Sequence, residues 1–152
     1  MKYLPHNLHI VFIVCILIFC GCYKAEKQIS NRILDLSETY QKLLINHNKE
    51  RANKSLSLFV PNDTLTFYAQ NHAEVMASRD KLYHSDISDL LGRFGLVGEN
   101  IAFGQENEET VVDSWMHSTG HRANILNAQF TQVGFGVAEK NNRLYWVTVF
   151  AN

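Results

Sequence analysis

Hydrophobic and polar positions follow the period of a helix in three long segments of the chain. In each of them apolar side chains recur every three to four residues, which predicts a helix with one buried face. The three segments are residues 31–52, 63–81 and 107–120. Asn62 and Asp63 before the second segment, and Asn107 before the third, are residue types that cap helix starts. Shorter helices are predicted at residues 86–94 and 121–126.

Near the C-terminus the period changes to two, which is typical of strands. Residues 133–137 alternate apolar side chains with glycines, and residues 144–151 are β-branched and aromatic. A turn at 139–142 separates them, so we predict a hairpin. Gly134 and Gly136 share one face of it, where the missing side chains would let a helix or another backbone approach closely.

The N-terminal segment has the features of a secretion signal. The apolar run Leu8–Phe19 is shorter than the roughly 20 residues of a membrane-spanning helix, and Lys2 precedes it. The four residues that end at Cys22 resemble a bacterial lipoprotein processing site, so we predict a signal peptide at 1–22 with Cys22 as the lipidated residue. An ordinary signal peptide and an uncleaved anchor are the alternatives. The polar segment 23–35 is predicted to be a tether and the start of the first helix.

Composition limits the classes of protein that fit. The chain has 152 residues, 46% of them hydrophobic, which suits one domain with a sizeable core. Its formal net charge of -1 argues against an electrostatic nucleic-acid binder. The three cysteines all lie in or just after the signal segment, so the domain has no disulfide framework. They are Cys15, Cys20 and Cys22.

Three motifs occur in a specific order. They are His47, Asn48 and Arg51 on the first helix, the run GENIA at 98–102, and the pattern WxxSxGHRxNIL at 115–126. Together with the glycines and aromatic residues of the hairpin, they resemble the CAP superfamily of cysteine-rich secretory, antigen 5 and pathogenesis-related proteins. The resemblance is to the bacterial, cysteine-free members and covers residues 36–152.

The resemblance implies an α+β fold. It would be a three-layer α-β-α sandwich, in which a small, mainly antiparallel sheet lies between helices. One or two further strands must then lie between Ser55 and Gly104. The residues themselves predict a turn at Gly98–Ala102 that enters a buried stretch.

The resemblance also implies a cleft that is lined by two histidines and an acid. By motif position these are His84, His121 and Glu99, while Ser118 replaces a second acid. His84 and His121, with Glu99, would form a partial shell for Zn²⁺. Alternatively Glu99 hydrogen-bonds a histidine and sets its tautomer. Glu99 is the candidate general base, whereas Ser118 lies outside any nucleophile motif and is expected to cap a helical turn.

Other polar residues of the motifs are expected to support the fold. We predict that His47, Asn48 and Arg51 are buried anchors that tie the first helix to the GENIA segment. Asn100, Arg122 and Asn124 are expected to satisfy carbonyl and amide groups of loops. His72 and His117 are expected to be packed or surface histidines.

Three functions remain open at this point. The first is an exported binding module, either a cell-envelope lipoprotein or a secreted protein, that presents its cleft to a small or hydrophobic ligand or a protein partner. The second is a metal-assisted hydrolase of peptide or cell-wall material. The third is an envelope interaction or stress protein with a vestigial cleft. In each case we expect no nucleic-acid partner, and membrane contact only through the N-terminal lipid anchor or signal segment.

Overall fold

A computed structural model describes the backbone of residues 7–152, with side chains from residue 24 onward except at 33 and 34. The chain divides into two compact units, residues 1–37 and 38–152. Helix α1 (Asn7–Ala52) begins in the first unit and ends in the second, so the segment 23–35 is helical. No helix among the described residues is long and apolar enough to span a membrane. The Cys22 side chain lies outside the described residues, and its lipidation stays a prediction.

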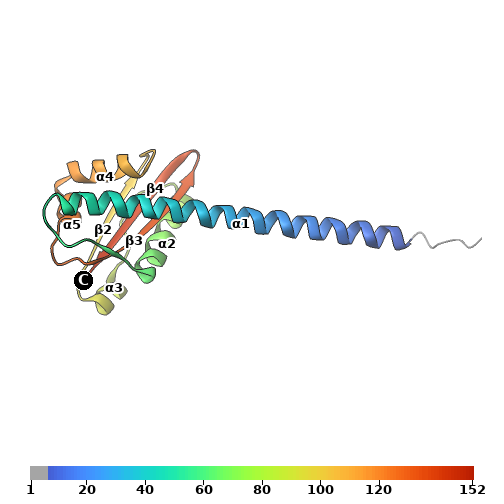
Figure 1. The fold of residues 1–152 in the computed structure, drawn as a ribbon, viewed down its shortest axis with the longest axis horizontal. Coiled ribbons are helices and arrows are strands. Elements are labelled where there is room, and N and C mark those ends of the chain that lie inside the picture. The colour runs from blue at the N-terminus through green and yellow to red at the C-terminus, as the bar shows by residue number, and fades with distance from the viewer. Residues whose placement is uncertain (1–6) are drawn as a thin grey trace, which may run out of the picture. The chain divides into compact units, whose positions relative to one another are not determined.

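The second unit contains a four-stranded mixed sheet in the order β1-β3-β4-β2 (Figure 1). The strands are β1 (Val60–Pro61), β2 (Val97–Phe103), β3 (Gln132–Lys140) and β4 (Arg143–Ala151). Strand β4 pairs antiparallel with both β2 and β3, while β1 pairs parallel with β3. The predicted hairpin is therefore confirmed, and β1 and β2 are the two strands expected earlier in the chain.

The GENIA segment is a strand, and its prediction as a turn was wrong. Residues 98–102 lie inside β2, where they pair with residues 146–150 of β4. Gly98 does not turn the chain there. A Cβ atom at Gly98 would meet the Phe130 ring at 2.9 Å and Asn124 Oδ1 at 3.1 Å, so the glycine provides room for these side chains.

Four further helices complete the fold. They are α2 (Asp63–Arg79), α3 (Ser88–Phe94), α4 (Glu108–His117) and α5 (Thr119–Ile125). The predicted caps are confirmed, because Asn62 accepts a hydrogen bond from the Leu65 amide and Asn107 forms a capping box with Thr110. Ser118 separates α4 from α5, but its hydroxyl forms no capping hydrogen bond. Instead its backbone carbonyl accepts a bond of 2.8 Å from the Arg122 amide.

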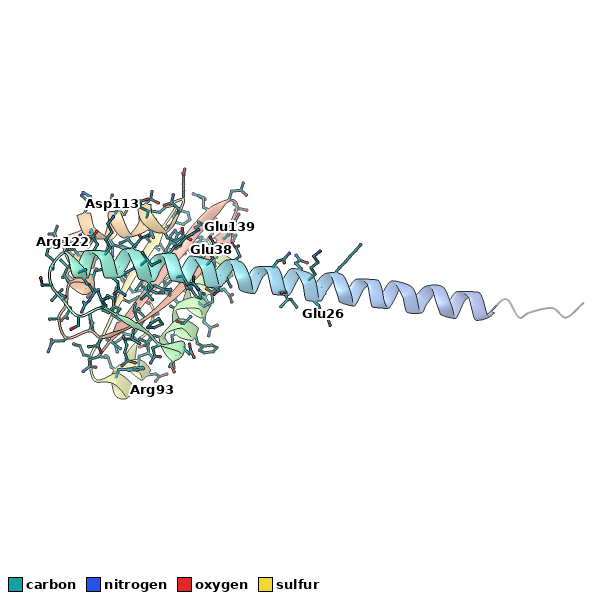
Figure 2. The ribbon with its side chains drawn as sticks, viewed as in Figure 1. Glu26, Glu38, Arg93, Asp113, Arg122 and Glu139 are labelled. Atoms are coloured by element: carbon teal, nitrogen blue, oxygen red, sulfur yellow. The ribbon has the colours of Figure 1, made fainter. Side chains whose placement is uncertain are left out.

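Two hydrophobic clusters, one on each face of the sheet, confirm the three-layer α+β arrangement. Helices α1, α4 and α5 pack on one face, through Leu43, Val111, Val112, Trp115 and Ile125. Helices α2 and α3 pack on the other, through Leu65, Ala69, Ala73, Met76, Ala77 and Leu90. Figure 2 shows the side chains that fill the space between the layers.

Helix α2 approaches β3 closely at the two glycines, as the sequence predicts. A Cβ atom at Gly136 would lie 2.2 Å from the carbonyl carbon of Ala69, and one at Gly134 would lie 2.1 Å from the Thr66 nitrogen. Both contacts are with backbone atoms, which cannot move aside without displacing α2. The two glycines therefore set the distance between α2 and the sheet.

His47 is fully buried on the opposite side of the sheet. Its Nδ1 donates to the Leu43 carbonyl at 2.8 Å, while its Nε2 is buried without a hydrogen-bond partner among the described residues. The rings around it belong to Phe59, Trp115, Phe135 and Phe150. Burial lowers the pKa of His47 from 6.5 to about 4, so the imidazole is neutral in the folded protein at pH 7.

Adding one methyl group at Gly136 is expected to destabilise the protein strongly. The Cβ of Gly136→Ala overlaps the α2 backbone, and overpacking of this kind costs about 3 kcal/mol. Urea denaturation of the variant and the wild type would measure the loss of free energy of unfolding.

The matched control for that variant is Gly92→Ala. Gly92 lies in α3, and no atom is within 4 Å of the position that its Cβ would take. Alanine also favours a helix by up to about 1 kcal/mol over glycine. Equal stability of the two variants would contradict the close packing of α2 on the sheet.

A second prediction concerns pH. Because the pKa of His47 is depressed by folding, the unfolded chain binds more protons than the folded one between about pH 4 and 6.5. Stability should fall as the pH falls through this range, by about 3 kcal/mol at 1.4 kcal/mol per pKa unit. Urea denaturation at pH 7 and pH 4.5, compared between the wild type and His47→Gln, isolates this contribution. A wild-type loss no larger than that of the variant would contradict it.

Candidate functional site

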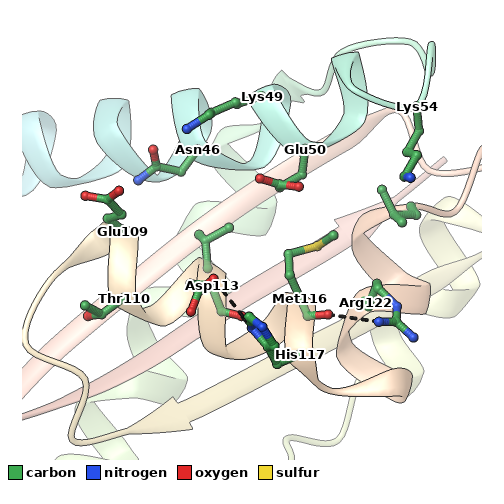
Figure 3. Close-up of a pocket in the computed structure, with 12 residues that line it drawn as sticks. Asn46, Lys49, Glu50, Lys54, Glu109, Thr110, Asp113, Met116, His117 and Arg122 are labelled. Carbon is green, nitrogen blue, oxygen red and sulfur yellow. Dashed lines mark hydrogen bonds and ion pairs between the residues drawn. The ribbon is translucent and has the colours of Figure 1, made fainter.

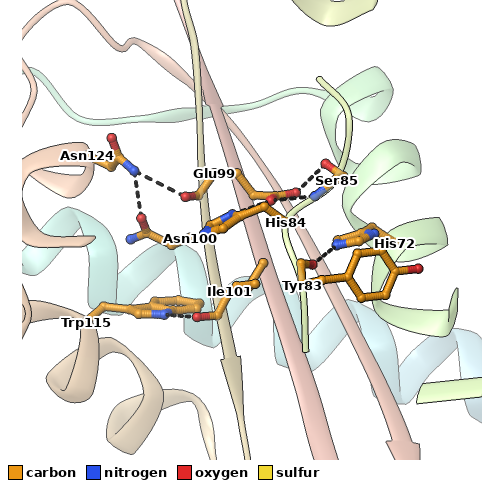
Figure 4. Close-up of polar contacts among 9 residues, drawn as sticks. All are labelled: His72, Tyr83, His84, Ser85, Glu99, Asn100, Ile101, Trp115 and Asn124. Atoms are coloured by element: carbon orange, nitrogen blue, oxygen red, sulfur yellow. Dashed lines mark hydrogen bonds and ion pairs between the residues drawn. The ribbon is translucent and has the colours of Figure 1, made fainter. Parts of the chain in front are cut away.

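The predicted acid Glu99 is buried and makes hydrogen bonds through both of its carboxylate oxygens. Its Oε1 accepts from Nδ1 of His84 at 2.7 Å and from the Ser85 amide at 3.0 Å, while its Oε2 accepts from the Ser85 hydroxyl at 2.5 Å (Figure 4). The Glu99 side chain is 3% exposed and that of His84 is 62% exposed. Glu99 thus holds the proton of His84 on Nδ1 and leaves Nε2 free to contact a ligand.

Helix α2 fixes the residue that precedes His84. His72 contacts the Tyr83 carbonyl through Nε2 at 2.6 Å, and its ring meets the Tyr83 ring edge-on. Arg79 donates to the Tyr83 hydroxyl at 2.9 Å. The loop that carries His84 is therefore held at its start by α2 and at its centre by Glu99.

The second predicted histidine, His121, lies on α5 and is half-buried. Burial lowers its pKa, and the charge of His84 lowers it further. The two imidazoles therefore interact electrostatically, and both causes favour the neutral form of His121. The structure joins His84 and Glu99 by a direct hydrogen bond, whereas no side-chain hydrogen bond connects His121 or Ser118 with them among the described residues.

Helices α4 and α5 cover the outer edge of β2, which is an edge strand of the sheet. Trp115 Nε1 donates to the Ile101 carbonyl at 3.2 Å, and Asn124 donates to the Glu99 carbonyl at 3.3 Å. Asn124 also donates to the Asn100 side chain at 2.8 Å. These bonds occupy carbonyls that would otherwise be open to another strand. The sequence predicted Trp115 only as a core residue and did not predict its hydrogen bond to the edge of β2.

Asn100 connects this edge directly to the candidate site. Its amide nitrogen donates to the His121 carbonyl at 3.0 Å. Asn100 is fully buried and Glu99 almost so, and their side chains point to opposite faces of β2 because they are neighbours in a strand. Neighbouring residues of one strand therefore hold the His84 side chain, through Glu99, and the His121 backbone, through Asn100.

The anchors on α1 contact other segments than the one expected. Asn48 bonds both backbone groups of Phe59, and Arg51 bonds carbonyls of the 57–60 link and of residues 125–130. The expectation that they tie α1 to the GENIA segment was wrong. The sequence could not show this, because Arg51 and its partners lie up to 79 residues apart.

The histidines and Glu99 offer limited metal chemistry. Among the described residues there is no group of three or more His, Cys, Asp or Glu side chains that could hold an ion. Both oxygens of Glu99 accept hydrogen bonds, which leaves Nε2 of His84 and the imidazole of His121 as electron-pair donors to a metal. These residues fit an exchangeable two-histidine site that water would complete, rather than a closed structural zinc site.

A hollow of about 670 Å³ lies elsewhere on the molecule, between the end of α1 and helices α4 and α5 (Figure 3). None of the four predicted cleft residues lines it. Its lining includes Lys49, Glu50 and Lys54 from α1 and the turn that follows. No sequence pattern predicted this hollow, because helical spacing marks the buried stripe of α1 and not its outer face.

Comparison with known proteins gives consistent results. Residues 44–150 match the family model described as CAP, the cysteine-rich secretory protein family. The uncharacterized protein YkwD of Bacillus subtilis (strain 168) is 36% identical over 104 residues, which is 62% of this chain and 40% of that protein. The structure of an extracellular protein with an SCP domain from Bacillus anthracis str. Ames is 28% identical, with a TM-score of 0.68, over 76% of this chain and 41% of that one.

A third similar protein is the cysteine-rich secretory protein SAV1118 of Staphylococcus aureus subsp. aureus Mu50. Its structure has a TM-score of 0.61 at 22% identity, and the match covers 75% of this chain and 39% of that chain. At this level of identity the similarity concerns the fold alone. The chain spans less than half the length of all three proteins.

The proximity of the two histidines can be tested by titration. Replacing His84 by asparagine, whose amide can still donate to Glu99, removes the charge that lowers the pKa of His121. We expect the pKa of His121 to rise but to stay below the ordinary value, because burial is the larger cause of its shift. NMR titration of the His121 ring protons would measure it.

The control for this titration is His117→Asn, which removes an exposed histidine whose ring bonds the Asp113 carbonyl. It should leave the pKa of His121 unchanged. An unchanged pKa of His121 in the His84 variant as well would mean that the two rings do not interact.

Proposed function

Because the chain belongs to the CAP (cysteine-rich secretory protein) family, we propose that it is an exported binding module with its ligand site at His84 and His121. The match over residues 44–150 confirms the family resemblance of the three sequence motifs. The proposed ligand is a small or hydrophobic molecule or a protein partner. The site consists of the imidazoles of these two histidines, with Glu99 of β2 bonded to the first.

One observation carries the proposal. Both oxygens of the Glu99 carboxylate are engaged with His84 and Ser85, and its side chain is almost completely buried. A general base needs a lone pair within hydrogen-bond reach of the proton that it removes. Glu99 therefore acts as a positioning residue, which holds His84 in one tautomer and one orientation for contact with a ligand.

The alternative, a metal-assisted hydrolase, has less support from these residues. A bound Zn²⁺ would polarise a carbonyl and acidify a water molecule, with His84 and His121 as its protein ligands. Neither the engaged Glu99 nor Ser118 is placed to supply a base or a nucleophile beside them. We therefore propose that a metal, where it binds, is a part of ligand recognition.

Export is the second part of the proposal. It is supported by the apolar run Leu8–Phe19 and by the lipoprotein-like residues that end at Cys22. The similar protein from Bacillus anthracis is described as extracellular. We propose that this chain also acts outside the cytoplasm, as an envelope lipoprotein through Cys22 or as a secreted protein.

Calorimetric titration of the purified chain with Zn²⁺ would test the donor set. We expect weak binding that disappears in the double variant His84→Ala and His121→Ala, because these two imidazoles are the available donors. The variant His117→Ala, which removes an exposed histidine on α4, should bind like the wild type. Binding that survives in the double variant would rule out the proposed pair of ligands.

A turnover assay separates the binding module from the hydrolase. The chain is incubated with peptide pools and with peptidoglycan, with Zn²⁺ or with a chelator, beside Glu99→Gln. We expect no cleavage above the level of the variant. Cleavage that a chelator and Glu99→Gln both abolish would replace our proposal with the hydrolase.

A further inference from the structure

We infer that the hollow between α1 and helices α4 and α5 is a second binding site, whose ligand is a short peptide with free termini. This site is independent of His84 and His121. Its volume of about 670 Å³ lies within the range of about 300–1,000 Å³ that is common for ligand pockets. The apolar side chains of Val112, Met116 and Leu126 supply its hydrophobic contacts.

The charges around this hollow are balanced, which favours a zwitterion over an ion of one sign. Three basic side chains, Lys49, Lys54 and Arg122, and three acidic ones, Glu50, Glu109 and Asp113, line it. Figure 3 shows Lys54 and Arg122 together at one end and Glu109 at the other, with Lys49, Glu50 and Asp113 between them. A ligand with its carboxylate at the first end and its ammonium group farther along the groove matches this pattern.

The charges are also available to a ligand. Lys54, Glu50 and Glu109 form no ion pair or side-chain hydrogen bond with any other described residue. Arg122 uses only Nη1, which donates to the Met116 carbonyl at 3.2 Å. Glu109 lies at the end opposite Lys54 and Arg122 and is exposed. A ligand ammonium group would supply a partner for its carboxylate.

The length of the groove selects a peptide of about three residues. The stretch of α1 and the following turn from Asn46 to Lys54 covers roughly 12 Å at the helical rise of about 1.5 Å per residue. An extended peptide covers about 3.3 Å per residue, so three residues place their termini at the two ends. Small apolar side chains of the peptide would suffice to contact Val112, Met116 and Leu126.

Ligand-observed NMR titration of the full chain with tri-alanine tests this inference. The peptide should bind, and capping either its amino or its carboxyl terminus should weaken binding about threefold to fivefold, as expected for loss of one exposed ion pair. Lys54→Gln should weaken binding of tri-alanine but not of its C-terminal amide. Glu109→Gln, at the other end of the groove, should weaken binding of tri-alanine but not of its N-acetyl form.

The control is Lys81→Gln, which removes an exposed lysine in the turn after α2, outside the lining of the hollow. It should leave all affinities unchanged, and none of the variants should alter Zn²⁺ binding at His84 and His121. The inference is overturned if doubly capped tri-alanine binds as well as the free peptide. It is also overturned if decanoate, an anionic apolar chain, binds and tri-alanine does not.

Discussion

The buried guanidinium of Arg51 is the group on which the positions of α1, α5 and the link to β1 depend. Its nitrogens donate to four carbonyls, those of Ser57, Ile125, Asn127 and Phe130. It also lies over the Phe59 ring, 3.9 Å from the centroid. A buried charge that lost such partners would destabilise the fold by about 3 kcal/mol or more. All these segments must therefore be in place together.

This constraint reaches the candidate site through α5. Since Arg51 holds the end of α5, the Asn124 side chain is placed against β2, where it bonds Asn100 and the Glu99 carbonyl. Asn100 in turn bonds the His121 carbonyl. These bonds hold the outer edge of β2, the strand that carries Glu99, against α5. The motifs HNxxR, GENIA and WxxSxGHRxNIL are the parts of one hydrogen-bonded structure that holds two histidines in place.

Helix α5 also links the two proposed binding surfaces. His121 belongs to the histidine site, and its neighbour Arg122 lines the groove beside α1. Ligands at the two surfaces would therefore contact neighbouring residues of one seven-residue helix. The fold therefore positions both surfaces with one short helix.

Much of the fold could be predicted from local patterns. The buried faces of α1 and α2, the caps Asn62 and Asn107, and the β3–β4 hairpin follow from periods and residue types within a few positions of each other. The close approach at Gly134 and Gly136 was also predicted, because two glycines on one strand face leave room that only a neighbouring element can fill. His84, Glu99 and His121 were named through the family resemblance, and the structure shows a hydrogen bond between the first two.

The sequence by itself therefore determined the helices, their caps and the hairpin, because these depend on residues close together in the chain. Only the tertiary structure decided that GENIA is a strand, since its pairing with β4 is nonlocal and the buried Glu99 and Asn100 interrupt the apolar pattern. It also decided which carbonyls Arg51 binds and which charges gather beside α1. These contacts join residues tens of positions apart, and packing selects them from many pairings that local sequence patterns allow.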